Sequence, residues 1–398
     1  MNFLFISNYI NHHQIPFCSE MIKLLGKDNF KFIQTQAMEK DRQDMGWGEM
    51  IKDPDYLLIK TDENTDEIKK MIRDYDVVLL GWSLDTDVNE CCIKRAMEDK
   101  LLIRMSERIY RDGQWKAISP RGLVAKYKEH IRFRNKNVYM LCNGAYVASD
   151  FALIHAYKNK MFRWGYFPEL KTYTDEQMKD MKRISPDGKL NIMWSGRFME
   201  GVKNPDFVLD LAKVLKDKKI PFRMNIVGDG EMSDALHGKA SDLGLGDVIT
   251  FHGFLPPQRV RIMMEDSQIY LFTSNNLEGW GAVVNEAMNS GCAVVAGSMA
   301  GSVPYLISHD KNGIIYDKEN IDDFIKKAVY LAENKGLQRR LGQNAYRTIK
   351  DIWNAEVAAK RLVDFCISRQ NGEKYDAPCD GPMSIAPIIK PYIKVEGL

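Results

Sequence analysis

Two glutamates, Glu278 and Glu286, lie on either side of a glycine-rich turn within residues 269–307. A carboxylate accepts two hydrogen bonds, so each side chain can hold a pair of sugar hydroxyls. Residues 282–290 have helical spacing, and a helix N-terminus beside glycines suits a diphosphate. Either glutamate alone is more often a solvated surface acid. The combination suits a ligand that carries both a diphosphate and sugar hydroxyls.

Arg197 and Lys203 form a second group of chemically useful side chains. They follow a strand-like run at residues 190–194, within the sequences Ser-Gly-Arg at 195–197 and Lys-Asn-Pro at 203–205. Two such cations can pair with the charges of a phosphate-bearing ligand. No Asp-x-Asp is well placed to hold a metal together with a diphosphate, so we expect no metal and no other cofactor.

Both groups resemble signatures of one known family. Residues 278–291 read EGWGAVVNEAMNSG, which resembles the Glu-x7-Glu signature of retaining GT-B glycosyltransferases, specifically glycosyltransferase family four. The Ser-Gly-Arg and Lys-Asn-Pro runs resemble the upstream signature of that family. The chain departs from the usual pattern twice, with Trp280 in place of phenylalanine and Pro304-Tyr305 in place of Pro-Glu. The resemblance covers the second half of the chain well and the first half loosely.

The resemblance implies a fold and a donor site. The fold would be α/β of the GT-B type, with two Rossmann-like doubly wound parallel-sheet domains facing a cleft. Arg197 and Lys203 would hold the diphosphate of a nucleotide-sugar donor, Glu286 the ribose hydroxyls, and Glu278 the hydroxyls of the donor sugar. The backbone amides just before and at the start of the helix, those of Trp280, Gly281 and Ala282, would also stabilise the diphosphate.

Three further glycines are candidate ligand contacts, because each follows a predicted strand: Gly196, Gly228 and Gly253. A residue without a side chain lets the backbone approach a ligand closely. In the family, the segment corresponding to residues 252–254 lies near the nucleotide base. No G-x-G-x-x-G follows a strand, which disfavours a nicotinamide dehydrogenase.

The first half offers two histidines and a glutamate as candidates. His12 and His13 follow the first predicted strand, at residues 3–6. Ligands of doubly wound domains bind at the carboxyl ends of strands, so a role for at least one histidine is as reasonable as capping or packing. Glu107 follows a predicted strand at 101–105, where many family members have a histidine that approaches the reacting sugar.

Two segments of the first half are candidates for contact with larger partners. Residues 40–56, with Asp41, Arg42 and Trp47, are predicted to form an irregular loop. This loop either contacts an acceptor sugar or is a surface loop without a ligand, and we favour the second interpretation. Residues 120–136 carry many basic side chains against Glu129 alone. We expect this stretch to be an amphipathic surface segment that meets anionic lipid, and the alternative is a solvated basic helix. No recognition motif supports binding to nucleic acid.

The length of 398 residues allows two domains of ordinary size. We expect an N-terminal acceptor domain at 1–168, a linker at 169–189, a nucleotide-sugar domain at 190–352, and a helix and tail at 353–398 that return to the first domain. Strands are predicted at 3–6, 30–33, 77–80, 101–105, 138–142, 190–194, 222–227, 248–251, 269–273, 292–296 and 314–316. Helices are predicted at 17–25, 65–74, 88–99, 205–216, 231–243, 258–265, 282–290, 321–333, 337–350 and 355–368.

Several classes of site are disfavoured. The seven cysteines are odd in number and show no C-x-x-C, so neither a disulfide framework nor a zinc site is expected. Most of them are expected to be buried small hydrophobes. Asp85 and Asp87 stand near a predicted helix start and are expected to cap it, while Asp53 and Asp55 read as turn residues. A net charge of +2 implies no global polyelectrolyte partner. No signal-peptide core or membrane-spanning run is present, so we expect a cytoplasmic protein, peripheral on the inner face of the membrane if residues 120–136 bind lipid.

The sequence therefore predicts a retaining, metal-independent hexosyltransferase. It would move a sugar from a nucleotide donor, with UDP favoured, to a glycan or lipid-linked glycan acceptor. Resemblance to capsule and lipopolysaccharide enzymes implies a role in bacterial surface polysaccharide biosynthesis. Two alternatives remain: a nucleotide-sugar 2-epimerase with the same fold, and a non-catalytic partner protein that binds a sugar nucleotide.

Overall fold

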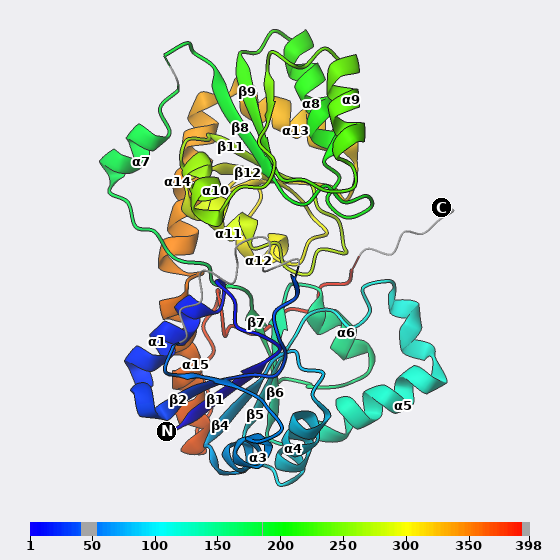
Figure 1. The fold of residues 1–398 in the computed structure, drawn as a ribbon, viewed down its shortest axis with the longest axis vertical. Helices are drawn as coiled ribbons and strands as arrows, with labels where there is room; N and C mark the ends of the chain where they lie inside the picture. The colour runs from blue at the N-terminus through cyan, green and yellow to red at the C-terminus, as the bar shows by residue number, and fades with distance from the viewer. Residues whose placement is uncertain (41–53, 185, 392–398) are drawn as a thin grey trace. The chain divides into compact units, whose positions relative to one another are not determined.

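The computed structural model describes residues 1–40, 54–184 and 186–391. It forms two compact units, Met1–Glu169 with Trp353–Leu398, and Leu170–Ile352 (Figure 1). The predicted loop at 40–56 lies almost wholly outside the described residues, including Asp41, Arg42 and Trp47, and so does Asp53.

The first unit is built on a parallel sheet of seven strands in the order β3-β2-β1-β4-β5-β6-β7. Buried apolar runs form the central strands, as both faces of a parallel sheet must be covered. The strands are β1 (Phe3–Ser7), β2 (Phe30–Gln34), β3 (Leu57–Ile59), β4 (Val77–Leu80), β5 (Leu102–Ser106), β6 (Val138–Asn143) and β7 (Met161–Trp164). Strands β3 and β7 are additions to the five strands that the sequence predicted here.

Helices cover both faces of this sheet, and α1 packs against the returning helix α15 (Figure 1). The α-helices are α1 (Ile15–Leu25), α3 (Thr65–Asp74), α4 (Thr86–Met97), α5 (Pro120–Glu129), α6 (Val147–Leu153) and α15 (Ala355–Gln370). The 3-10 helices are η1 (Lys27–Asn29), η3 (Gln114–Ile118) and η4 (Ile131–Phe133).

The tail after α15 belongs to the first unit as far as residue 391. Its Ser384 carbonyl accepts from the Arg163 amide at 2.8 Å, and the Ala386 amide donates to the Met161 carbonyl at 3.0 Å. The tail thus pairs antiparallel with β7 and covers an edge that would otherwise expose backbone groups.

The second unit contains a parallel sheet of six strands in the order β10-β9-β8-β11-β12-β13. Its strands are β8 (Leu190–Ser195), β9 (Phe222–Val227), β10 (Ile249–Phe251), β11 (Ile269–Phe272), β12 (Ala293–Gly297) and β13 (Ile314–Tyr316). Its helices are α7 (Asp175–Met181), α8 (Asp206–Asp217), α9 (Ser233–Asp242), α10 (Pro257–Glu265), α11 (Val283–Asn289), α12 (Val303–Leu306), α13 (Ile321–Glu333) and α14 (Lys335–Asp351).

Residues 170–184, expected to lie in a linker, are attached to the second unit by a buried lysine. The Lys182 ammonium donates to the carbonyls of Met264, Glu265 and Ser267 at 2.7, 2.8 and 2.6 Å. It therefore caps the last turn of α10, whose carbonyl groups have no helical partner. Burial lowers the pKa of Lys182, and Cys292 at 3.6 Å opposes that effect.

The basic segment predicted at 120–136 has a different extent from the one expected. Helix α5 ends at Glu129, and His130 and Phe133 are buried in the first unit. Arg134 donates from Nε to the carbonyl of His155 at 2.9 Å. His130 and Phe133 thus anchor the end of the segment in its domain. The part up to Glu129 lies at the surface, and Arg134 is exposed again beyond the anchor.

Six of the seven cysteines are buried and Cys379 is exposed, and all seven are unpaired thiols. Burial raises the pKa of the Cys92 thiol to about 12. The expectation that most of the cysteines are small buried hydrophobes is therefore confirmed.

Candidate functional site

The strand order of the second unit places two loops together. Strands β8 and β11 are neighbours at the centre of the sheet, and the chain leaves them toward opposite edges. Ligands of open parallel sheets bind beside the carboxyl ends of strands at such a switch point. The loop after β8 carries Arg197 and Lys203, and the loop after β11 carries Glu278. The topology therefore brings the two predicted groups of residues to one site.

Lys203 and Glu278 form an ion pair, Nζ to Oε2, that is only partly exposed to solvent. Two hydrogen bonds also join the loop after β8 to the loop after β11. The Thr273 hydroxyl donates to the Lys203 carbonyl at 2.6 Å, and the Asn275 amide donates to the Val202 carbonyl at 2.9 Å. Without a ligand, the predicted diphosphate cation and the predicted sugar carboxylate neutralise each other.

Two asparagines and a glutamate support this pair, and the sequence had assigned them no role. Asn275 donates from Nδ2 to the Gly201 carbonyl at 2.7 Å and to Glu319 Oε1 at 2.8 Å. Asn204 donates to the Thr273 carbonyl at 3.1 Å and has a φ of +45°, a left-handed conformation that asparagine tolerates. Asn204 lies in the Lys-Asn-Pro motif and Asn275 lies three residues before Glu278, so both could have been found from the sequence, whereas nothing in the sequence marks Glu319.

Arg197 follows Gly196 directly in the loop after β8 and is half-buried. Its carbonyl accepts from the Met199 amide at 2.9 Å, and the next amide, of Phe198, donates to the Asp229 carbonyl at 2.9 Å. These contacts tie the Arg197 backbone to the loop after β9. A diphosphate role for its guanidinium remains a prediction.

Gly196, Gly228 and Gly253 meet although they follow three different strands. The Gly228 amide donates to the Gly253 carbonyl at 2.8 Å, and the Gly196 amide donates to the Val227 carbonyl at 3.0 Å. Gly228 has a φ of +136°, and a Cβ added there would lie 1.9 Å from the Gly196 carbonyl oxygen. Gly228 is therefore required for the packing of one loop on another, and its predicted contact with a ligand remains a prediction.

The Trp280 side chain is buried and faces the protein interior. Its Nε1 donates to Asn285 Oδ1 at 2.8 Å, and its ring lies 6.4 Å from that of Tyr305, edge to face. The two departures from the usual family pattern are thus in contact, and an aromatic pair forms where Phe and Glu are usual. The turn continues through Gly281, whose φ of +87° explains the glycine, to Ala282, the N-cap of α11.

Glu286 lies in α11 with its side chain partly exposed. Burial raises the pKa of its carboxyl above the ordinary value, and the Arg261 guanidinium partly offsets this. Within the described residues, no hydrogen bond reaches the Glu286 carboxylate. Its acceptor capacity is therefore available to hydroxyl groups. The helix ends as predicted, with Gly291 at a φ of +72°.

The first unit gathers its own candidates at the carboxyl ends of β1 and β5. Glu107 Oε1 accepts from the Tyr166 hydroxyl at 2.8 Å, and Glu107 Oε2 pairs with Arg111. The His13 ring stacks on the Tyr166 ring, with 5.9 Å between the ring centroids. The centroid of the His12 ring lies 3.8 Å from that of the His13 ring. His13 and Glu107 thus share one neighbour, Tyr166, to which the sequence analysis had given no role.

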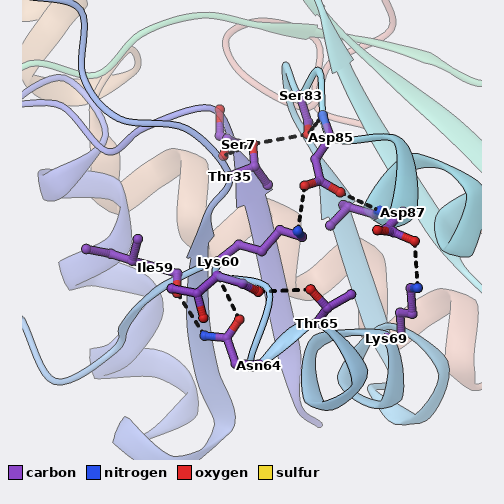
Figure 2. Close-up of polar contacts among 12 residues, drawn as sticks. Ser7, Thr35, Ile59, Lys60, Asn64, Thr65, Lys69, Ser83, Asp85 and Asp87 are labelled. Atoms are coloured by element: carbon purple, nitrogen blue, oxygen red, sulfur yellow. Dashed lines mark hydrogen bonds and ion pairs between the residues drawn. The ribbon is translucent and has the colours of Figure 1, made fainter.

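A polar network beside these loops explains the Asp85 and Asp87 pair (Figure 2). Asp85 accepts from the Val88 amide at 2.9 Å, so it caps α4 as predicted. Its other oxygen pairs with Lys60 Nζ at 2.9 Å, while Asp87 pairs with Lys69 at 2.6 Å. Both aspartates therefore have structural partners.

Comparisons with known proteins find similarity to glycosyltransferases in the second half of the chain. Residues 176–348 match the family model described as Glycosyl transferases group 1. An uncharacterized glycosyltransferase of Haemophilus influenzae is 31% identical over 144 residues, which are 36% of this chain and 40% of that protein. The poly(ribitol-phosphate) alpha-N-acetylglucosaminyltransferase of Staphylococcus aureus is 27% identical over 159 residues, which are 40% of this chain and 31% of that protein. The chain thus spans less than half the length of these curated relatives.

A solved structure extends the similarity to both units. Anabaena Alr3699/HepE in complex with UDP superposes with a TM-score of 0.65 and 14% identity, over 92% of this chain and 100% of that chain. With the two parallel-sheet units, this likeness shows the GT-B fold that the sequence predicted. In the part of the chain that is described, no helix has the length and apolar character needed to cross a bilayer.

Proposed function

We propose that this protein is a retaining glycosyltransferase that uses a UDP-linked sugar and no metal ion. The observation that carries the proposal is the meeting of Lys203 and Glu278 at the switch point of the second unit, within the segment that matches the glycosyltransferase model. A donor would separate the pair, with Lys203 turning to the diphosphate and Glu278 to hydroxyls of the sugar. The UDP held by the Anabaena neighbour supports the choice of nucleotide.

The remaining donor contacts follow from the chemistry of the loops. Arg197 and Lys203 would stabilise the negative charge that grows on the departing diphosphate. Glu286, whose carboxylate has open acceptor capacity, would hold the ribose hydroxyls. The bond between the anomeric carbon and the diphosphate oxygen breaks as the acceptor oxygen bonds to that carbon from the same face. The diphosphate then takes the proton of the acceptor hydroxyl.

We place the acceptor on the first unit, near His13 and Glu107. Glu107 is fixed by Tyr166 and Arg111, so it is oriented before any ligand arrives. The acceptor is proposed to be a glycan or a lipid-linked glycan of a bacterial surface polysaccharide. The poly(ribitol-phosphate) named for the Staphylococcus aureus relative, a polymeric acceptor, supports this class.

The role of Arg197 provides the first test. Arg197→Ala is expected to lower kcat by about a hundredfold or more, as the loss of one transition-state donor does. Arg223→Ala is the matched control, because it removes the same charge from an exposed position on β9 that pairs with Asp187. Turnover of Arg197→Ala equal to that of the control would refute the assignment.

Product analysis tests the reaction class. Purified protein is incubated with UDP-sugars, with and without a glycan acceptor and with excess chelator. Transfer that needs the acceptor, persists in chelator and retains the anomeric configuration is expected. Conversion of the UDP-sugar without acceptor would indicate an epimerase, and binding of donors without any turnover would indicate a non-catalytic partner.

A further inference from the structure

A helical arm of the first unit, formed by η3 and α5 over residues 114–129, has no buried residue. In Figure 1, α5 lies apart from the sheet of its unit. Most helices of globular proteins are stabilised by burying an apolar face, and this one buries none. Its apolar side chains must therefore either remain in water or meet a partner.

The apolar side chains of the helical arm are large and exposed. Trp115, Ile118, Val124 and Tyr127 are 69%, 80%, 58% and 56% exposed, and Leu123 is 39% exposed. Leu123, Val124 and Tyr127 fall on one face of α5, since residues three and four apart are neighbours on a helix. Contiguous exposed apolar groups of this kind mark an interaction site.

Basic residues flank this apolar face. The arm carries four basic side chains against Glu129 alone. Lys116 and Lys126 are paired with Asp112 and Glu129, at 2.6 and 2.9 Å. Arg121 and Lys128 make no ion pair with any described residue, and both are exposed. The helical spacing places these two cations together beside the apolar face.

Both ends of the helical arm are anchored. At the start, Gln114 donates from Nε2 to the buried Asp150 at 2.8 Å, and Asp150 also pairs with Arg108. At the end, His130 is buried, with Nδ1 2.9 Å from the Tyr157 hydroxyl. The exposed face therefore belongs to a fixed element of the domain.

We propose that the helical arm docks this protein on a bilayer surface that contains anionic lipid. Charge complementarity favours anionic lipid as the partner, because the basic side chains can pair with lipid phosphates while the apolar face and Trp115 enter the interfacial region of the bilayer. A second copy of the chain fits less well, because a symmetric contact between two basic arms brings like charges together. Lipid binding needs neither donor nor acceptor, so the inference goes beyond the proposed transfer reaction.

The test is co-sedimentation of the full chain with phosphatidylcholine vesicles, with and without phosphatidylglycerol. The wild type is expected to bind only the anionic vesicles, and more weakly as salt rises. One basic residue near an anionic surface contributes about fivefold in affinity, so Arg121→Gln with Lys128→Gln should weaken binding about 25-fold. Val124→Ser with Tyr127→Ser should weaken it at least tenfold, because less apolar area enters the interface.

A charge-matched control separates the helical arm from general electrostatics. Lys326→Gln with Lys335→Gln removes the same charge from exposed positions on α13 and α14 and should leave vesicle binding within about twofold of the wild type. Tryptophan quenching by brominated lipid should fall in Trp115→Phe. Three results would each overturn the proposal: no binding of the wild type to anionic vesicles, equal losses in the arm and control variants, or a dimer in solution that the Val124 and Tyr127 substitutions dissociate.

Discussion

Gly228→Ala is expected to damage both stability and activity, because it disturbs the contact between two site loops. The added Cβ would lie 1.9 Å from the Gly196 carbonyl oxygen, whereas real Cβ atoms stay beyond 3.0 Å. The loop after β8 must then retreat by about 1 Å, and it carries Arg197 at the next position. The φ of +136° adds backbone strain for any residue with a side chain.

Two costs combine in this variant. Overpacking against backbone costs about 1–3 kcal/mol, and a rarely populated backbone conformation costs about 1–3 kcal/mol. We expect the free energy of unfolding to fall by about 2–6 kcal/mol. A displacement of about 1 Å at a positioning loop lowers kcat about a hundredfold, so the folded fraction should also be a poor catalyst.

Urea unfolding, together with UDP calorimetry and steady-state kinetics, measures these effects. Gly238→Ala is the control, since Gly238 lies inside α9 with nothing within 4 Å of an added Cβ. Alanine is the better helix former there, so Gly238→Ala should raise the free energy of unfolding by about 1 kcal/mol. Unchanged stability of Gly228→Ala, or an equal loss in Gly238→Ala, would show that the loop contact does not matter as argued.

Three further predictions concern charge. Glu278→Gln should bind UDP about fivefold more tightly, because Lys203 loses its competing partner, yet turn over more slowly; calorimetry that finds weaker binding would contradict this. Burial raises the pKa of Glu286, so UDP affinity should fall with acidification at a higher pH than for an ordinary glutamate, and Glu286→Gln should have a flat profile. Burial, assisted by Arg104, lowers the pKa of His130 to about 3. Between about pH 6.5 and 3 the unfolded chain therefore binds more protons than the folded chain, and the free energy of unfolding falls on acidification by up to about 1.4 kcal/mol per pH unit. If His130→Asn showed the same slope of unfolding free energy against pH, this histidine would be excluded as its source.

Local sequence determined most of the elements. Strand β9, strand β13 and helix α13 have the bounds that were predicted, since apolar runs and helical spacing are properties of neighbouring residues. Gly291 after α11 and Asp85 before α4 likewise act as predicted, because a helix end is specified by the residue that satisfies it. Strands β3 and β7, which form the two edges of the seven-stranded sheet, were missed.

The site required the tertiary structure. Lys203 and Glu278 belong to separate motifs, and only the adjacency of β8 and β11 makes them an ion pair. Gly228 was expected to contact a ligand, and the structure adds a packing reason for this glycine, the Gly196 carbonyl beside it. Phe133 and Val124 were both expected in one surface segment, yet Phe133 is buried and Val124 exposed. Residue type and spacing thus determined which groups are able to act, whereas long-range packing, which no local pattern contains, decided which of them meet and which face water.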